Sequence, residues 1–189
     1  MDRRAFISMI AAGSATTLLQ QTANAQPVPK VQNVVFVHGL FADGSCWSEV
    51  IARLQPKGIQ VMSVQNPLTT LKQSVEATQR ALALQQGPTV SVGHSFAGMI
   101  VTEAGMAPNV SAVVYVAARA PDAGEDYMAR FAMKRWRSGL IVRSSVETAY
   151  QLGFERMGAK TIEVKASNVS LISQPDIITN LILEAAGQS

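Results

Sequence analysis

The sequence predicts an α/β fold, with a mostly parallel sheet and helices on both of its faces. Short apolar runs alternate along the chain with segments of helical periodicity, which is the order that a parallel sheet with crossover helices requires. Of the 189 residues, 48% are hydrophobic and 15% are charged, so the chain can bury a sizeable core. We therefore expect one domain over residues 26–189, preceded by a segment that does not belong to the fold.

The first expected strand is Val31–Val37, a β-branched run. A helix over Cys46–Leu54 follows it, and Gly58 is the expected stop signal just beyond the helix. The next strand is Ile59–Val64, whose extension ends at Pro67 because proline cannot donate to a sheet ladder.

The middle of the chain continues the alternation. Leu71–Gln85 is rich in good helix formers and is broken by Gly87-Pro88. A strand over Thr89–Val92 and a helix with little polar surface over Phe96–Met106 come next. Val110–Ala117 reads as another buried strand.

The pattern loosens after Ala120. Asp122–Ser138 is expected to be partly helical, and its basic residues indicate a solvated face or a truncated lid, or alternatively a patch for an anionic lipid or substrate. The remaining expected elements are a short strand over Leu140–Arg143, a helix over Glu147–Met157, a strand over Lys160–Lys165 and an amphipathic helix over Pro175–Ala186.

Residues 1–25 have the features of an export signal. Arg3-Arg4 precede a mildly apolar run, and Ala23-Asn24-Ala25 has the small-x-small form that signal peptidases cleave. The paired arginines resemble a twin-arginine signal, which implies folding before export to the periplasm. An ordinary secretory signal and a retained anchor are the alternatives. The apolar run is too short for a transmembrane helix, so we expect no stable membrane span after the signal is removed.

A sharp turn between a strand and a helix is expected at Gly93-His94-Ser95-Phe96-Ala97-Gly98. A serine on such a strained turn projects its hydroxyl from the carboxyl edge of the sheet, where it can act as a nucleophile. The residues at positions 93 and 97 must be small, because strand and helix approach closely there. The sequence therefore predicts a nucleophile elbow with Ser95 as the nucleophile.

A second motif, His38-Gly39-Leu40-Phe41, stands at the end of the first expected strand. Together, Val35–Trp47 and Val92–Met99 resemble the α/β-hydrolase family, within it the small esterases similar to plant salicylate-ester hydrolases and hydroxynitrile lyases. The resemblance extends from about residue 31 to about residue 125. It resumes weakly near Leu140 and more clearly over residues 156–187.

This resemblance implies an α/β-hydrolase core. The backbone N–H groups of Leu40 and Phe96 would form the oxyanion hole, and His38 and Gly39 would shape the loop. The family has glycine where this chain has Ala97, which is a small departure. The family's helical lid is reduced here to about residues 121–139, which predicts a shallow, open site.

The base that a serine nucleophile needs is missing from its expected position. The chain has two histidines: His38 belongs to the loop motif, and His94 directly precedes Ser95, so its side chain should point away from the Ser95 hydroxyl. In the family, the catalytic histidine follows the last strand. Asn168 occupies that position here, and an asparagine side chain cannot accept a proton near neutral pH.

The acid that would orient the base has two candidates, Glu147 and Asp122. The alternative interpretation of each is a surface or capping residue. The single cysteine, Cys46, excludes an internal disulfide and is interpreted as a small apolar residue rather than a reactive thiol.

These observations leave three hypotheses. The chain is a serine carboxylesterase of small esters with weak or altered catalysis, an inactive relative that binds a small apolar ligand, or an interaction protein that uses apolar surface left by the reduced lid. No metal cluster, phosphate-binding loop or dinucleotide fingerprint occurs, so we expect no cofactor and no metal. The net charge of +3 gives no dense basic stripe, so we expect no nucleic-acid partner.

Overall fold

The computed structural model describes residues 30–118, 139–144 and 160–188. Several expectations from the sequence lie outside these ranges: the export signal, the lid segment apart from its last residue, the helix over residues 147–157, and the two candidate acids, Asp122 and Glu147. Within these ranges, no helix is long and apolar enough to cross a membrane.

The core of the fold is one six-stranded sheet with the order β2-β1-β3-β4-β5-β6. All five pairs of neighbouring strands are parallel, as the alternation of strands and helices predicts. The strands are β1 (Asn33–Val37), β2 (Gln60–Val64), β3 (Thr89–His94), β4 (Val110–Val116), β5 (Gly139–Ser144) and β6 (Lys160–Val164).

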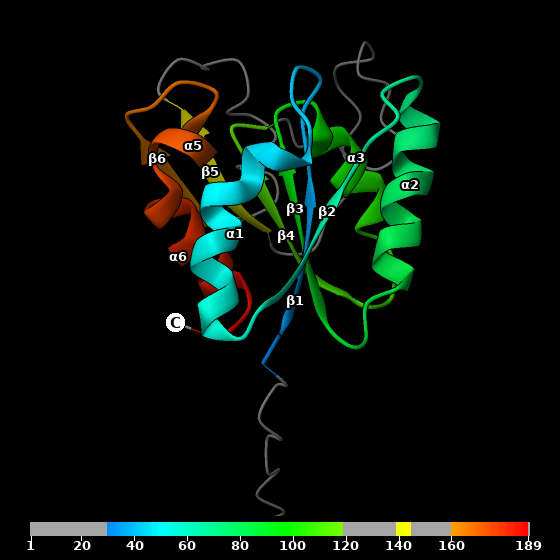
Figure 1. Ribbon diagram of the computed structural model, residues 1–189, viewed down its shortest axis with the longest axis horizontal. Helices are drawn as coiled ribbons and strands as arrows, with labels where there is room; N and C mark the ends of the chain where they lie inside the picture. The colour runs from blue at the N-terminus through cyan, green and yellow to red at the C-terminus, as the bar shows by residue number, and fades with distance from the viewer. Residues whose placement is uncertain (1–29, 119–138, 145–159, 189) are drawn as a thin grey trace, which may run out of the picture.

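Helices cover both faces of this sheet, which confirms the predicted layers (Figure 1). They are α1 (Ser48–Leu54), α2 (Leu71–Ala83), α3 (Ala97–Ala104), α5 (Ser170–Ser173) and α6 (Pro175–Ala185), with short 3₁₀ helices at Gly44–Trp47 (η1) and Gln55–Lys57 (η2). Helices α1 and α6 lie on one face, and α2 and α3 lie on the other.

Strand β1 shows how the sheet separates two hydrophobic cores. Val34 and Phe36 pack into the core on the α1 and α6 side, whereas Val35 and Val37 pack into the core on the α2 and α3 side. All four side chains are fully buried. A strand that is covered on both faces has no polar side, which is why this segment reads as a continuous apolar run.

The helix expected over Cys46–Leu54 begins differently in the structure. Residues 44–47 form the 3₁₀ turn η1, and the α-helix starts only at Ser48. The Asp43 side chain caps η1 by accepting a hydrogen bond from the Ser45 N–H at 2.8 Å. Hydrogen bonding to the Ser45 side chain, and secondly to its N–H, lowers the pKa of Asp43. Apolar periodicity alone does not reveal this capped turn. The four-residue helix α5 was likewise not expected, because one turn is too short to show a period.

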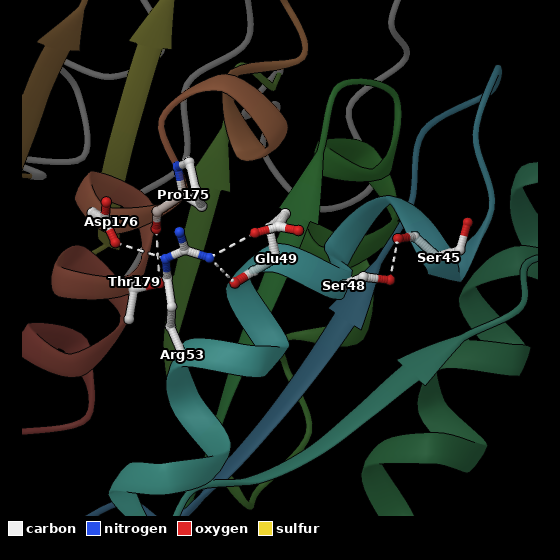
Figure 2. A network of polar contacts seen from close by, with 7 residues as sticks. All are labelled: Ser45, Ser48, Glu49, Arg53, Pro175, Asp176 and Thr179. Carbon is white, nitrogen blue, oxygen red and sulfur yellow. Dashed lines mark hydrogen bonds and ion pairs between the residues drawn. The ribbon is translucent and has the colours of Figure 1, made fainter.

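A polar network joins the two helices on the first face (Figure 2). The Arg53 side chain on α1 donates to the Asp176 carboxylate on α6 at 2.6 Å and to the Glu49 carboxylate at 2.8 Å. Both acidic side chains are largely exposed to solvent, so each pair contributes little to stability. The two contacts of Arg53 nonetheless connect α1 to the first turn of α6.

Candidate active site

Ser95 lies on a strained turn between β3 and α3. Its φ of +55° is in the left-handed region, which a non-glycine residue seldom adopts. The Ser95 N–H donates to the Val116 carbonyl on β4 at 3.2 Å, and the Ser95 carbonyl accepts from the Gly98 N–H at 3.1 Å. The surrounding backbone therefore holds the serine at the carboxyl edge of the sheet, which is the geometry expected for the elbow.

Gly93 shows why the residues around the elbow must be small. A Cβ at Gly93 would lie 2.8 Å from the Ala97 carbonyl oxygen and 2.7 Å from the Val101 Cγ2. Strand β3 and helix α3 therefore approach too closely for any side chain at Gly93. Ala97 is itself fully buried, so its methyl group is accommodated where the family has glycine.

The loop after β1 lies directly against the elbow. A Cβ at Gly39 would lie 3.0 Å from the Ser95 Cβ and 3.2 Å from the His94 carbonyl oxygen. Leu40, the next residue, is half exposed. In the part of the chain that the structure describes, the N–H groups of Leu40 and Phe96 donate to no protein acceptor. Phe96 follows Ser95 directly and Leu40 follows Gly39, which packs against Ser95, so these two N–H groups are the candidates for an oxyanion hole.

His38 braces this loop. The side chain is buried, its Nδ1–H donates to the Gly39 carbonyl at 2.9 Å, and its Nε2 accepts from the Asn66 N–H at 3.0 Å. The Asn66 side chain in turn donates to the His38 carbonyl at 3.1 Å. Because both ring nitrogens are engaged, His38 has no free lone pair with which to take a proton from Ser95.

The structure brings Asn168 to the elbow, although it follows β6 in the chain. The Asn168 side-chain amide donates to the Ala117 carbonyl at 3.2 Å, just after β4. The Asn168 backbone carbonyl accepts from the His94 Nε2–H at 2.9 Å. The amide is a hydrogen-bond donor with no basic nitrogen, so it cannot deprotonate Ser95.

His94 lies beside Ser95 in the chain, and its Nε2 is engaged with Asn168. The ring is 4% exposed and packs edge-on against Trp47, with ring centroids 6.3 Å apart. Because Nε2 carries the proton, Nδ1 is an acceptor, and it has no partner among the described residues. Burial lowers the pKa of His94, so the ring is neutral at pH 7.

The remaining candidates for chemistry are the Cys46 thiol, a group of metal ligands and the two candidate acids. Burial raises the pKa of the Cys46 thiol to about 11, with a smaller effect from Asp43, so this cysteine stays protonated and unreactive at neutral pH. Across residues 30–118, 139–144 and 160–188, no three His, Cys, Asp or Glu side chains gather as metal ligands do. The candidate acids lie outside these ranges.

Two residues of this site were missed by sequence reasoning. Ala117 has a φ of +43° and presents its carbonyl to Asn168. Asn66, which follows β2, donates hydrogen bonds to the ring and the backbone carbonyl of His38 and so holds the loop after β1 in position. Nothing in the sequence marks an alanine for left-handed backbone. An asparagine just after a strand was a weak signal that could have indicated Asn66, because such residues bond neighbouring backbone.

Both the sequence and the fold are similar to those of known proteins. The sequence model of a family described as "Alpha/beta hydrolase family" matches residues 34–172. No curated protein matches the sequence. A solved pyrethroid hydrolase from Sphingobium faniae JZ-2 has a TM-score of 0.65 at 14% identity, covering 83% of this chain and 98% of that chain.

Two further solved structures are similar. Polyneuridine aldehyde esterase has a TM-score of 0.66 at 15% identity, covering 82% of this chain and 98% of that chain. Tomato methylketone synthase I in complex with 2-tridecanone has a TM-score of 0.66 at 13% identity, covering 84% of this chain and 98% of that chain. At these identities the likeness shows the fold and leaves the chemistry to the residues of the site.

Proposed function

The chain belongs to the α/β-hydrolase family, and from this premise we propose that it is a serine carboxylesterase of small esters with weak or altered catalysis. The observation that carries the proposal is the elbow itself. Ser95 is held at a φ of +55° on the turn between β3 and α3, with Gly39 packed against it, and strained conformations of this kind cluster at functional sites.

The proposed reaction begins with attack of the Ser95 Oγ on the carbonyl carbon of the ester. The N–H groups of Leu40 and Phe96 would stabilise the oxyanion that forms, and collapse of the intermediate would expel the alcohol and leave an acyl group on Ser95. Water would then hydrolyse the acyl-enzyme. Each of these steps uses groups that lie at the carboxyl edge of β1 and β3.

Asn168 explains why the catalysis is weak or altered. The hydroxyl proton of Ser95 must go to a base, and the amide at this position donates to Ala117 instead. Water must then accept the proton. A serine hydrolase without its triad keeps a residual advantage of roughly 10³–10⁴ over water from the oxyanion hole and from binding, so slow turnover is expected rather than none.

The alternative is an inactive α/β-hydrolase-like protein that binds a small apolar ligand. Exposed apolar side chains support it: Leu40 and Phe41 lie on the loop after β1, Val169 precedes α5, and Ile172 lies on α5. The methylketone synthase of similar fold was solved with 2-tridecanone, an apolar ketone. An oxyanion hole without a base would hold such a carbonyl oxygen without reacting.

Turnover of p-nitrophenyl acetate by the purified full chain tests the proposal, with Ser95→Ala as the matched control. We expect slow turnover that Ser95→Ala abolishes, and a covalent adduct on Ser95 after treatment with an activated fluorophosphonate. Turnover equal to that of Ser95→Ala would reject the esterase. Displacement of a bound apolar dye by 2-tridecanone, in a protein without turnover, would instead favour the ligand-binding alternative.

We also propose that the protein is exported to the periplasm through a twin-arginine signal. The support is the Arg3-Arg4 pair with the Ala23-Asn24-Ala25 cleavage form. Cell fractionation of a strain that expresses the Arg3→Lys/Arg4→Lys double variant tests this. The variant should remain in the cytoplasm, and an unchanged periplasmic fraction would argue for a different route.

A further inference from the structure

We propose that His94 is a positioning residue that holds the segment after β6, residues 165–169, against the nucleophile. The inference rests on the proposed function, because it concerns the position from which a base would serve Ser95. Its physical basis is the hydrogen bond from the His94 Nε2–H to the Asn168 backbone carbonyl at 2.9 Å.

This bond spans a large part of the sheet. His94 ends β3 and Asn168 follows β6, and the strands β4 and β5 lie between them in the sheet. Strands β3 and β6 are therefore not paired directly, and no backbone hydrogen bond of the sheet joins Ser95 to residue 168. Among the described residues, the other bond that ties Asn168 to this edge is made by its own side chain, to the Ala117 carbonyl.

The surroundings of His94 suit it to this role. The ring is 4% exposed, and the edge of Trp47 restricts its rotation. The bond to a carbonyl acceptor fixes the proton on Nε2. The buried His94 Nε2–H therefore holds the backbone of Asn168 in position. The position of this backbone determines where any side chain at residue 168 begins.

If a histidine is introduced at position 168, the hydrogen bond from His94 determines whether the new imidazole can reach Ser95. Asn168→His removes the amide that bonds Ala117, so among residues 30–118, 139–144 and 160–188 the bond from His94 to the backbone carbonyl is the remaining hydrogen bond between residue 168 and this edge of the sheet. Only if His94 keeps the carbonyl in place will the new imidazole reach Ser95 reproducibly. His94 thus acts on the reaction through residue 168 and does not contact the reacting atoms.

Amide hydrogen exchange of the full chain tests the tether without any requirement for activity. His94→Phe keeps a ring and removes the donor, whereas His94→Gln keeps an N–H. The reporters are the Ala166 and Ser173 amides, which bond Val164 and Val169. His94→Phe should raise their exchange rates on the order of tenfold, as loss of one buried hydrogen bond allows, and His94→Gln should restore much of the protection.

The matched control is Asn109→Leu. It removes a comparable side-chain bond, from the Asn109 amide to the Leu82 carbonyl, at the opposite edge of the sheet. This variant should leave the exchange of Ala166 and Ser173 unchanged. Equal protection of these amides in His94→Phe and the unaltered protein would overturn the inference.

A second measurement uses the unaltered protein and is independent of the folding of any variant. The ring ¹⁵N shifts of His94 should show the proton on Nε2 and a lone pair on Nδ1. A proton on Nδ1 would leave Nε2 unable to donate to Asn168, and would overturn the tether.

The consequence for chemistry is measured with Asn168→His as the background. Adding His94→Phe should lower kcat for p-nitrophenyl acetate at least tenfold with little change in KM, and adding His94→Gln should keep most of the activity. Equal kcat values in the three variants would overturn the positioning role. The proposed esterase is decided separately, by turnover of the unaltered protein against Ser95→Ala, and if Asn168→His has no activity, hydrogen exchange alone decides whether His94 holds residues 165–169.

Discussion

Gly39 lies so close to Ser95 that a methyl group on its Cα would stand 3.0 Å from the Ser95 Cβ. The same methyl group would be 3.3 Å from the His94 Nδ1. The loop after β1 and the nucleophile elbow therefore form one packed unit. The absence of a side chain at residue 39 allows the neighbouring N–H of Leu40 to lie beside the serine.

Gly39→Ala should slow the labelling of Ser95 by a fluorophosphonate at least tenfold. The added methyl group must push the loop or the serine aside, at a cost of about 1–3 kcal/mol in unfolding free energy. Gly58→Ala is the control: its φ of +79° makes alanine unfavourable, but nothing lies within 4 Å of the new Cβ. Gly58→Ala should lose about 1 kcal/mol and keep the labelling rate. Equal labelling in the two variants would contradict the packed unit.

The strained backbone of Ser95 should be visible in stability. Both serine and alanine are unfavourable at a φ of +55°, whereas glycine is not. Ser95→Gly should therefore be more stable than Ser95→Ala by about 0.5–1 kcal/mol, after allowance for the greater freedom of glycine in the unfolded chain. Urea unfolding of the two variants measures the difference. A less stable Ser95→Gly would mean that the turn is not strained.

Asn168 should stabilise the fold through its bond to Ala117. Asn168→Ala should lower the unfolding free energy by about 1 kcal/mol, as expected for one lost hydrogen bond. Asn168→Asp preserves the shape but places a carboxylate next to the Ala117 carbonyl. Above pH 5, Asn168→Asp should be less stable than Asn168→Ala. Its stability should increase in acid, where the protonated carboxyl can donate a hydrogen bond to the Ala117 carbonyl. Urea unfolding at pH 4 and pH 7 tests this, and identical stabilities of the two variants would contradict it.

His94 should make stability depend on pH. Its pKa in the folded protein is lowered by burial, whereas the unfolded chain titrates near the ordinary value of 6.5. As the pH falls through 6.5, the unfolded chain binds a proton that the folded protein does not, so the free energy of unfolding decreases until the pKa of the folded state is reached.

His94→Gln isolates this effect, because all other titrating groups are unchanged. Between pH 8 and pH 5.5, the unaltered protein should lose more stability in urea unfolding than His94→Gln does. Parallel curves for the two proteins would show that His94 is not a buried neutral imidazole.

Much of the fold follows from local patterns in the sequence. Val34–Val37 and Val113–Val116 are buried and form unbroken apolar runs, and the structure confirms a strand within each expected range, Val31–Val37 and Val110–Ala117. Helix starts are less predictable: η1 depends on an Asp43 cap, and α3 begins at Ala97 after a turn that the elbow requires. The predicted layers are correct because they depend on periodicity, whereas boundaries depend on single hydrogen bonds.

The site is predictable only in part. Ser95, Gly39, Leu40 and Phe96 follow from short motifs, because small residues are needed where backbones approach closely. The bond between His94 and Asn168 joins residues 74 positions apart, and no local pattern encodes it. The left-handed conformation of Ala117 was also not predictable, because neither this alanine nor its contact with Asn168, 51 positions away, is marked by a local pattern.

The esterase activity of Asn168→His shows whether Ser95 lacks only its base. If Ser95 is a complete nucleophile position that lacks only its base, kcat/KM for p-nitrophenyl acetate should rise about 100-fold, as general-base catalysis allows, and Ser95→Ala in the same background should abolish it. A variant that is folded and labelled at Ser95 but no more active than the unaltered protein would contradict the claim.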